Sequence, residues 1–146
     1  MPTIPYGRLL IVLSNIFTAF GAFTFDWTET HVLNPRWPPH AKFHNGQTMS
    51  LSIALVLLSA YLCFRPTMSL QQSRDSVWVA ALVSSLYGLT GLSAILYPGT
   101  DWQDPEFETS GKGAQKIVFG GVVVAAWVGY AVEMWRMGGG GKEKRG

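Results

Sequence analysis

The sequence contains three histidines, and all of them lie between residues 31 and 44. His40 and His44 are four residues apart and directly follow the pair Pro38-Pro39. Proline suits the first turn of a helix, because it lacks an N–H and its φ angle is already close to helical. If the proline pair opens a helix, His40, His44 and Gln47 lie on one face of it. Imidazoles at i and i+4 suit a pair of metal ligands, and they equally suit proton exchange with a carboxylate.

Carboxylates and amides accompany the histidines along the chain. Asp26 and Glu29 precede His31, and a second segment, 98–108, contributes four carboxylates. A carboxylic acid or imidazolium can donate a proton to an oxygen, and a carboxylate or neutral imidazole can take one from water or carbon. The candidate catalytic residues are therefore Asp26, Glu29, His31, His40, His44 and Asp101. The candidate substrate-binding residues are Asn34, Trp37, Asn45, Gln47 and Trp102.

Several other kinds of site have no counterpart in the sequence. It has no Gly-x-Ser-x-Gly elbow, no phosphate-binding glycine loop and no dinucleotide fingerprint. The single cysteine, Cys63, cannot form a disulfide framework or a thiolate metal cluster within the chain. The net charge of +2 is small and scattered, so nucleic acid is not the expected partner. We expect a lipophilic small-molecule substrate, with no metal and no cofactor.

The elements that must position these residues are four apolar runs. Each is long enough to cross a bilayer, which takes about 20 residues per helix. The runs are apolar nearly all round, whereas the helices of a water-soluble bundle have polar outer faces. Only 14% of the residues are charged, against roughly a quarter in soluble domains. The sequence predicts one all-α domain, 1–146, that forms an integral membrane four-helix bundle in a lipid bilayer. The predicted spans are at about 6–25, 47–64, 77–97 and 117–135. Residues 138–146 are expected to form a flexible basic tail.

Lysine and arginine counting predicts the orientation, because short loops rich in these residues stay in the cytosol. With four spans, both termini and the middle loop share one side. That side holds seven of the eleven basic residues: Arg8, Arg65, Arg74, Arg136, Lys142, Lys144 and Arg145. Both termini are therefore predicted to be cytosolic, with the histidine and carboxylate segments on the opposite side. The expected location is the membrane of the endoplasmic reticulum.

Two features of the spans leave alternatives open. Ala19 and Gly21 have the spacing that signal peptidase prefers, so the first run could be a cleaved signal that leaves three spans. Small residues recur at four-residue spacing, at Gly121, Ala125 and Gly129 and at Ser84 and Gly88. Such ladders let helices pack closely within a bundle, and they are also compatible with a homodimer. Asn15, inside the first run, is either an interhelical hydrogen-bonding group or a functional one.

The first polar segment carries a family resemblance. It reads Asp26-Trp27-Thr28-x-Thr30-His31-Val32-x-Asn34-Pro35-x-Trp37-x-x-His40-x-x-Phe43-His44. With four spans, it resembles small integral-membrane proteins of filamentous fungi, some of them encoded in secondary-metabolite clusters. The four-span architecture is similar over the whole chain, whereas the sequence motif is similar only in this segment. It implies epoxide hydrolysis or epoxide-opening cyclisation of a polyketide or terpenoid intermediate. A resemblance to sterol isomerases of the emopamil-binding type implies isomerisation by similar chemistry.

The leading hypothesis gives these residues roles in epoxide opening. Asp26 or Asp101 protonates the epoxide oxygen, and His40 or His44 activates water or an internal hydroxyl. Asn34 and Gln47 orient that nucleophile. Two rival hypotheses stay open: the histidines and acids could hold a metal or haem, or the chain could be a non-catalytic membrane subunit that scaffolds a partner.

Overall fold

The chain forms a bundle of helices in a computed structural model that describes residues 4–107 and 113–139. The elements are α1 (Tyr6–Asp26), α2 (Pro39–Phe64), α3 (Leu70–Ser93) and α4 (Ala114–Gly139), with two short 3-10 helices, η1 (Ala94–Leu96) and η2 (Pro105–Phe107). The described residues contain no β-strand. The prediction of an all-α, four-helix protein is confirmed.

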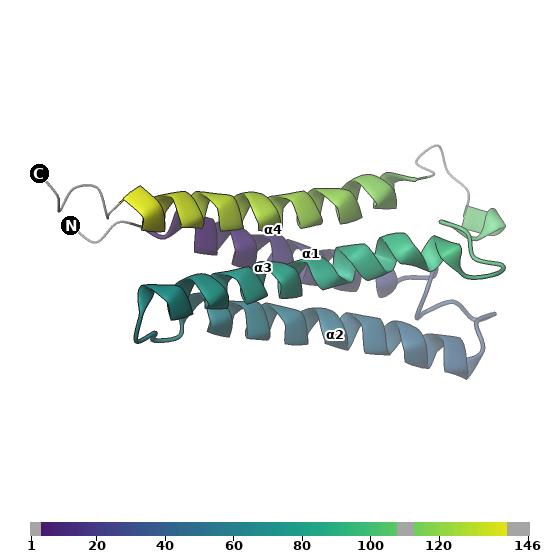
Figure 1. Ribbon diagram of the computed structural model, residues 1–146. Helices are drawn as coiled ribbons and strands as arrows, with labels where there is room; N and C mark the ends of the chain where they lie inside the picture. The colour runs from purple at the N-terminus through teal and green to yellow at the C-terminus, as the bar shows by residue number, and fades with distance from the viewer. Residues whose placement is uncertain (1–3, 108–112, 140–146) are drawn as a thin grey trace, which may run out of the picture.

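The four helices run up and down alternately (Figure 1). Each packs on its neighbour along the chain, and α1 also packs along α4, which closes the bundle. At one end, termed here the terminus end, α1 begins, α4 ends and the segment 65–69 joins α2 to α3. At the other, termed the loop end, lie the segments 27–38 and 94–107. The predicted histidine and carboxylate segments are therefore brought to the same end of the molecule.

The helix boundaries follow local sequence signals as well as the apolar runs. Pro39 is the first residue of α2, and Pro38 is its extended N-cap residue, as the proline pair predicts. α3 begins at Leu70 rather than at residue 77, because the Ser69 side chain caps it by accepting a hydrogen bond from the Gln72 backbone N–H at 3.1 Å. α4 includes residues 138 and 139, which the composition assigns to a tail. The rest of that tail, 140–146, lies outside the described residues.

All four helices are long and apolar enough to cross a membrane. Their outer faces carry large exposed apolar side chains. Phe20 is 69% exposed, Leu57 66% and Ile117 79%. A bundle made for water would place polar residues at these positions. The outer surface therefore suits a lipid bilayer.

Glycines allow close contacts between helices. A Cβ on Gly7 would lie 2.4 Å from the Gly129 carbonyl oxygen, so α1 and α4 touch through their backbones. A Cβ on Gly88 would lie 2.7 Å from the carbonyl oxygen of Phe119, which gives α3 and α4 a similar contact. Gly121 differs from the ladder prediction, because a Cβ there would meet nothing within 4 Å. Only part of the small-residue pattern therefore reflects packing inside the bundle.

Buried polar groups also connect the helices. Asn15 is 1% exposed, and its side-chain amide donates to Leu55 O at 3.1 Å, Ser59 Oγ at 2.9 Å and Ser84 Oγ at 3.1 Å. An amide has two hydrogens, so three acceptors share them. Asn15 thus connects α1 to α2 and α3, in agreement with the interhelical alternative.

Arg8 lies at the centre of a second polar network, at the terminus end. Its guanidinium donates to Glu133 Oε1 at 2.7 Å, to Ser73 Oγ at 2.6 Å and to the carbonyl oxygen of Cys63. These partners belong to α4, α3 and α2, so one side chain joins all four helices. Glu133 is fully buried, and it also accepts hydrogen bonds from Arg136. The count of basic residues used to predict the orientation treats Arg8 as a loop residue, but in the structure its side chain lies between the four helices.

Candidate functional site

Asp26, the last residue of α1, lies at the centre of a small polar cluster at the loop end. Its Oδ2 accepts a hydrogen bond from the side-chain amide of Asn45, on α2, at 3.0 Å. Its Oδ1 lies 3.9 Å from Nε2 of His31. Among the described residues, these are the only side-chain partners of Asp26 in hydrogen bonds and ion pairs. These three residues, Asp26, His31 and Asn45, are termed here the Asp26 cluster.

The backbone after α1 explains why His31 returns to Asp26. The Val32 N–H donates to the Asp26 carbonyl oxygen at 3.1 Å, and the Leu33 N–H donates to that of Thr28 at 2.9 Å. The His31 N–H also donates to Thr28 O, at 3.1 Å. These bonds fold the chain into one compact turn over the end of α1. A residue five positions after Asp26 therefore lies beside it.

The His31 ring is held on two further sides. Its Nδ1 lies 2.7 Å from Oγ1 of Thr30. Its ring meets Trp37 edge to face, with centroids 5.3 Å apart. With Nδ1 engaged by the hydroxyl, Nε2 is the ring nitrogen that faces Asp26. The 3.9 Å between Nε2 and Asp26 Oδ1 is too long for a direct hydrogen bond, so proton transfer between the two groups would pass through a water or a substrate oxygen that contacts both.

Asn45 supplies an acceptor that is not used within the described part of the protein. Its Nδ2 donates to Asp26, but its Oδ1 is buried and has no hydrogen-bond partner there. Buried polar atoms nearly always have a partner, which makes this oxygen a place for water or a substrate hydroxyl.

Arg36 and Glu106 form an ion pair that joins the two polar segments. Glu106 lies on η2, and its Oε1 also accepts from Asn34 Nδ2 at 3.4 Å. Asn34 is 1% exposed, and its Oδ1 accepts from the Arg36 N–H at 2.9 Å. The hydrogen bond from Arg36 lowers the pKa of Glu106, and the same bond raises the pKa of Arg36. Asn34, a candidate for substrate binding, thus has both ends of its amide engaged in holding the loop end together.

His40 and His44 share a face with Gln47, as their spacing predicts. Their Nε2 atoms are 3.0 Å apart, and His44 Nδ1 lies 3.3 Å from Gln47 Oε1. The two histidines are exposed, and their side-chain hydrogen bonds and ring contacts among the described residues stay within α2. Successive helical residues point about 100° apart, so Asn45 can face Asp26 while His44 faces outward.

The remaining candidates lie outside the Asp26 cluster. Glu29 is exposed. Asp101 is exposed too, and its Oδ1 accepts a hydrogen bond from the Trp102 N–H at 2.7 Å. Lys116 Nζ lies 5.1 Å from the centre of the Trp102 ring, a cation–π contact between the second polar segment and α4. No three His, Cys, Asp or Glu side chains among residues 4–107 and 113–139 are placed to hold a metal ion.

Two hollows open on the bundle away from these candidates. One, of about 550 Å³, lies between the first turns of α3 and the last turns of α4, at the terminus end. The other, of about 400 Å³, lies between α1 and α4 and is lined by apolar residues that include Phe17 and Ile117. Phe17 and Asp26 are nine residues apart, which at 3.6 residues per turn puts them on opposite faces of α1. This apolar hollow therefore does not lead to the Asp26 cluster.

The structure adds residues that the sequence does not single out. Thr30 contacts Nδ1 of His31, and Glu106 pairs with Arg36 and accepts a hydrogen bond from Asn34. The Thr30 hydroxyl, next to a histidine, is the one local signal. Glu106 belongs to the carboxylate segment 98–108, but its pairing with Arg36 has no local signal, because that pairing depends on how the helices pack.

The comparisons with known proteins give one match. A family model described as "Family of unknown function (DUF6640)" matches residues 10–145. No curated protein and no solved structure matches the chain.

Proposed function

The chain belongs to the DUF6640 family, whose function is unknown, and we propose that this protein is a membrane acid–base enzyme in which Asp26 and His31 act on the polar end of a lipophilic molecule. The observation that supports this proposal is the Asp26 cluster. It combines a carboxylate and an imidazole 3.9 Å apart with a buried amide oxygen that has no partner among the described residues. The proposal places the site at the membrane edge, on the non-cytosolic side of the endoplasmic reticulum.

The leading reaction is the opening of an epoxide. His31, as imidazolium, gives the proton on Nε2 to the epoxide oxygen while the carbon–oxygen bond breaks. A water oxygen forms the new bond to that carbon, and the Asp26 carboxylate takes one water proton. Asn45 Oδ1 accepts the second water hydrogen as a hydrogen bond and so orients the nucleophile. The product is a diol, and transfer of the proton from Asp26 to His31 resets the pair.

The same groups support two related reactions. If a hydroxyl of the substrate replaces water, the product is a cyclic ether, as in epoxide-opening cyclisation of a polyketide or terpenoid intermediate. If the base takes a proton from carbon and the acid returns one elsewhere, the result is isomerisation. All three reactions need one donor and one acceptor beside the polar end of an apolar substrate. Desolvation at the membrane edge would strengthen both interactions.

The first test is turnover by the purified protein in lipid vesicles. The substrates are alkyl, aryl and terpenoid epoxides, with diols and cyclic ethers measured by mass spectrometry. The wild-type protein is expected to convert at least one class. Asp26→Asn should lower kcat by about 10²-fold or more, as loss of a general acid or base does. Glu29→Gln, which changes an exposed acid nearby, is the control and should stay within about twofold, since surface substitutions are nearly neutral. A wild-type protein inactive on all three classes, or an Asp26→Asn variant of full activity, would overturn the proposal.

A non-catalytic role has one observation in its favour. Phe43 is 65% exposed and lies between the exposed His40 and His44, with its ring stacked on that of His40. Such an apolar and imidazole surface suits contact with another membrane protein. If this is the function, Phe43→Ser should abolish co-purification of a partner, while Asp26→Asn should leave that partner bound. The absence of a stoichiometric partner, or loss of the partner in Asp26→Asn but not in Phe43→Ser, would contradict a scaffolding role.

A further inference from the structure

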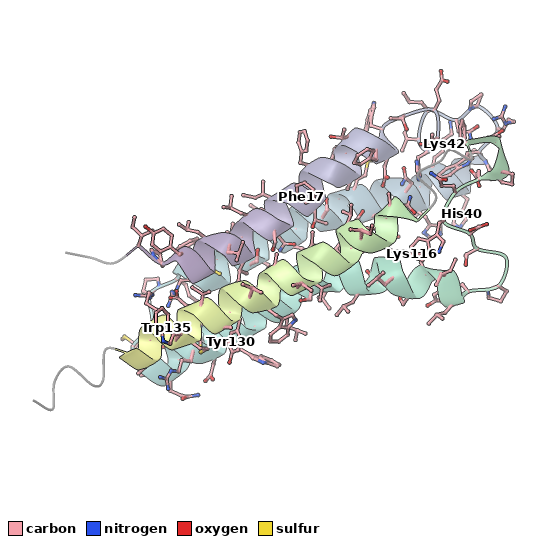
Figure 2. All side chains as sticks on the ribbon, turned by 90° about the horizontal axis from the view of Figure 1, so that it is seen from above. Phe17, His40, Lys42, Lys116, Tyr130 and Trp135 are labelled. Atoms are coloured by element: carbon pink, nitrogen blue, oxygen red, sulfur yellow. The ribbon has the colours of Figure 1, made fainter. Side chains whose placement is uncertain are left out.

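The larger hollow lies at the terminus end, opposite the Asp26 cluster. Figure 2 shows Tyr130 at this end and His40 and Lys42 at the other. The hollow is lined by one face of α3 and one face of α4. The lining residues are spaced at i, i+3, i+4 and i+7 on α3, and at i and i+4 on α4, so each set lies on one side of its helix. The lining residues are Gln71, Arg74, Asp75, Trp78, Tyr130 and Met134.

Arg74 is the cation of this hollow. It is partly buried, and none of the described residues forms a hydrogen bond or ion pair with it. The neighbouring arginines at this end differ, because Arg8 bonds to Glu133 and Arg65 donates to Ser76 Oγ at 2.8 Å. A guanidinium carries five N–H donors in a planar fork that matches phosphate oxygens. A partly desolvated guanidinium without an anion is therefore suited to binding one.

The polar residues beside Arg74 favour an anion as well. α3 begins at Leu70, so Gln71 lies in its first turn, where the helix dipole favours negative charge. Asp75 is the one acid in the lining, and its Oδ1 accepts a hydrogen bond from Gln71 Nε2 at 2.8 Å. That bond partly satisfies the carboxylate within α3. The Arg74 guanidinium is thus the group of this hollow that is suited to binding an anion.

The aromatic residues extend the hollow along the bundle. Trp78 is one helical turn beyond Arg74, about 6 Å along the axis, and it is 45% exposed. Tyr130 and Met134 face it from α4. Indole and phenol rings suit the boundary between headgroups and acyl chains. The hollow therefore offers a cationic end and an apolar end in the order in which a phospholipid presents its groups.

We propose that this hollow binds the phosphate of an anionic membrane lipid, with Arg74 holding the phosphate and Trp78 and Tyr130 contacting the glycerol and the upper acyl chains. The inference does not depend on the acid–base function, because it concerns the opposite end of the bundle. The shared chemistry is a phosphate group, which a lipid or a soluble phosphate could supply. Anionic lipids are the source favoured here, since the hollow continues into an apolar wall.

The test is native mass spectrometry of the purified full chain with dioleoyl phosphatidic acid or dioleoyl phosphatidylcholine. Wild-type protein should bind phosphatidic acid at least fivefold more tightly than phosphatidylcholine. Arg74→Gln should remove that preference, Arg74→Lys should keep part of it, and Asp75→Asn should strengthen binding about threefold by removing the nearby negative charge. Lys42→Gln, which removes a cation at the loop end, is the matched control and should bind as the wild type does.

A second arm separates the two phosphate sources. Inorganic phosphate at 10 mM should leave the bound phosphatidic acid in place if the apolar wall contributes to binding. Complete displacement by inorganic phosphate would overturn the lipid assignment. Equal binding by wild type and a folded Arg74→Gln variant, judged by an unchanged elution volume and helical circular dichroism, would overturn the site itself. If Arg74→Gln does not fold, a reduced preference in a folded Arg74→Lys variant supports the proposal, and an unchanged preference in that variant overturns it.

Discussion

Arg8, in the first turn of α1, and Glu133, near the end of α4, form an ion pair of 2.7 Å although 125 residues separate them. The Glu133 side chain is fully buried and that of Arg8 is 14% exposed. A buried charge without its partner is far costlier than an exposed one. The pair therefore fixes which ends of the first and last helices meet, and with them the closure of the bundle.

Glu133→Gln should weaken the bundle, because it leaves the Arg8 charge buried without an anion. The expected loss of unfolding free energy is about 3–5 kcal/mol. It can be measured by denaturant unfolding in a mild detergent, followed by circular dichroism. Glu29→Gln changes an exposed acid and is the control. Unfolding of Glu133→Gln at the wild-type denaturant concentration would show that the Arg8 network does not stabilise the fold.

Gly129→Ala should also destabilise the bundle, for steric reasons. The added Cβ would lie 2.7 Å from the Gly7 carbonyl oxygen, so α1 and α4 must move apart. Gly121→Ala is the matched control on the same helix, where a Cβ meets nothing within 4 Å. We expect a loss of about 1–3 kcal/mol for Gly129→Ala, as in other overpacked sites, and almost none for Gly121→Ala. Equal unfolding midpoints for the two variants would contradict the close contact.

Asn15→Leu should loosen the contact of α1 with α2 and α3. The substitution removes the donors to Leu55 O, Ser59 Oγ and Ser84 Oγ while keeping the number and branching of the side-chain heavy atoms. Interhelical hydrogen bonds in membranes contribute about 0.6 kcal/mol each, so the expected loss is about 1–2 kcal/mol by the same unfolding assay. If instead Asn15→Leu keeps full stability but loses turnover, Asn15 acts in function and not in packing.

The Arg36–Glu106 pair should make the loop end sensitive to acid. The hydrogen bond from Arg36 holds the pKa of Glu106 below its ordinary value of 4.5, so the ionised side chain is favoured in the folded protein. The stabilisation is therefore present above pH 4.5 and is lost as the pH falls through the lower, folded pKa. The readout is hydrogen exchange at the backbone N–H of Arg36, corrected for intrinsic rates. At pH 7 the Arg36 N–H should exchange more slowly in the wild type than in Glu106→Gln. Once Glu106 is protonated, the two proteins should exchange at the same rate. A difference in exchange rate that does not change with pH would contradict a stabilising Arg36–Glu106 pair.

The four helices follow from local features of the sequence, but the pairing of distant charges does not. Apolar runs of sufficient length predict the helices, and the lack of an N–H in proline predicts that α2 starts at the proline pair. Arg8 and Glu133 carry no such signal, because their contact depends on the register of α1 against α4 over 125 residues. The same holds for Arg36 and Glu106, which are 70 residues apart.

The candidate site was predictable as a set of residues and less so as an arrangement. Spacing predicts the shared face of His40 and His44, and the structure contains it. The position of His31 beside Asp26 depends on backbone hydrogen bonds in the turn 26–33, which residue types alone do not determine. As a result, the spacing favours the exposed pair on α2, whereas the geometry favours His31 as the partner of the carboxylate.

Two histidine variants distinguish the Asp26–His31 pair from the exposed histidine pair on α2. His31→Gln and His44→Gln remove the same group, but only His31 lies beside Asp26. The measurement is kcat for the best lipophilic epoxide by each variant in lipid vesicles. His31→Gln is expected to lower kcat by about 10²-fold or more, whereas His44→Gln should stay within about twofold of the wild type. Full activity of His31→Gln, or an equal loss in both variants, would contradict the assignment of Asp26 and His31 as the acid–base pair.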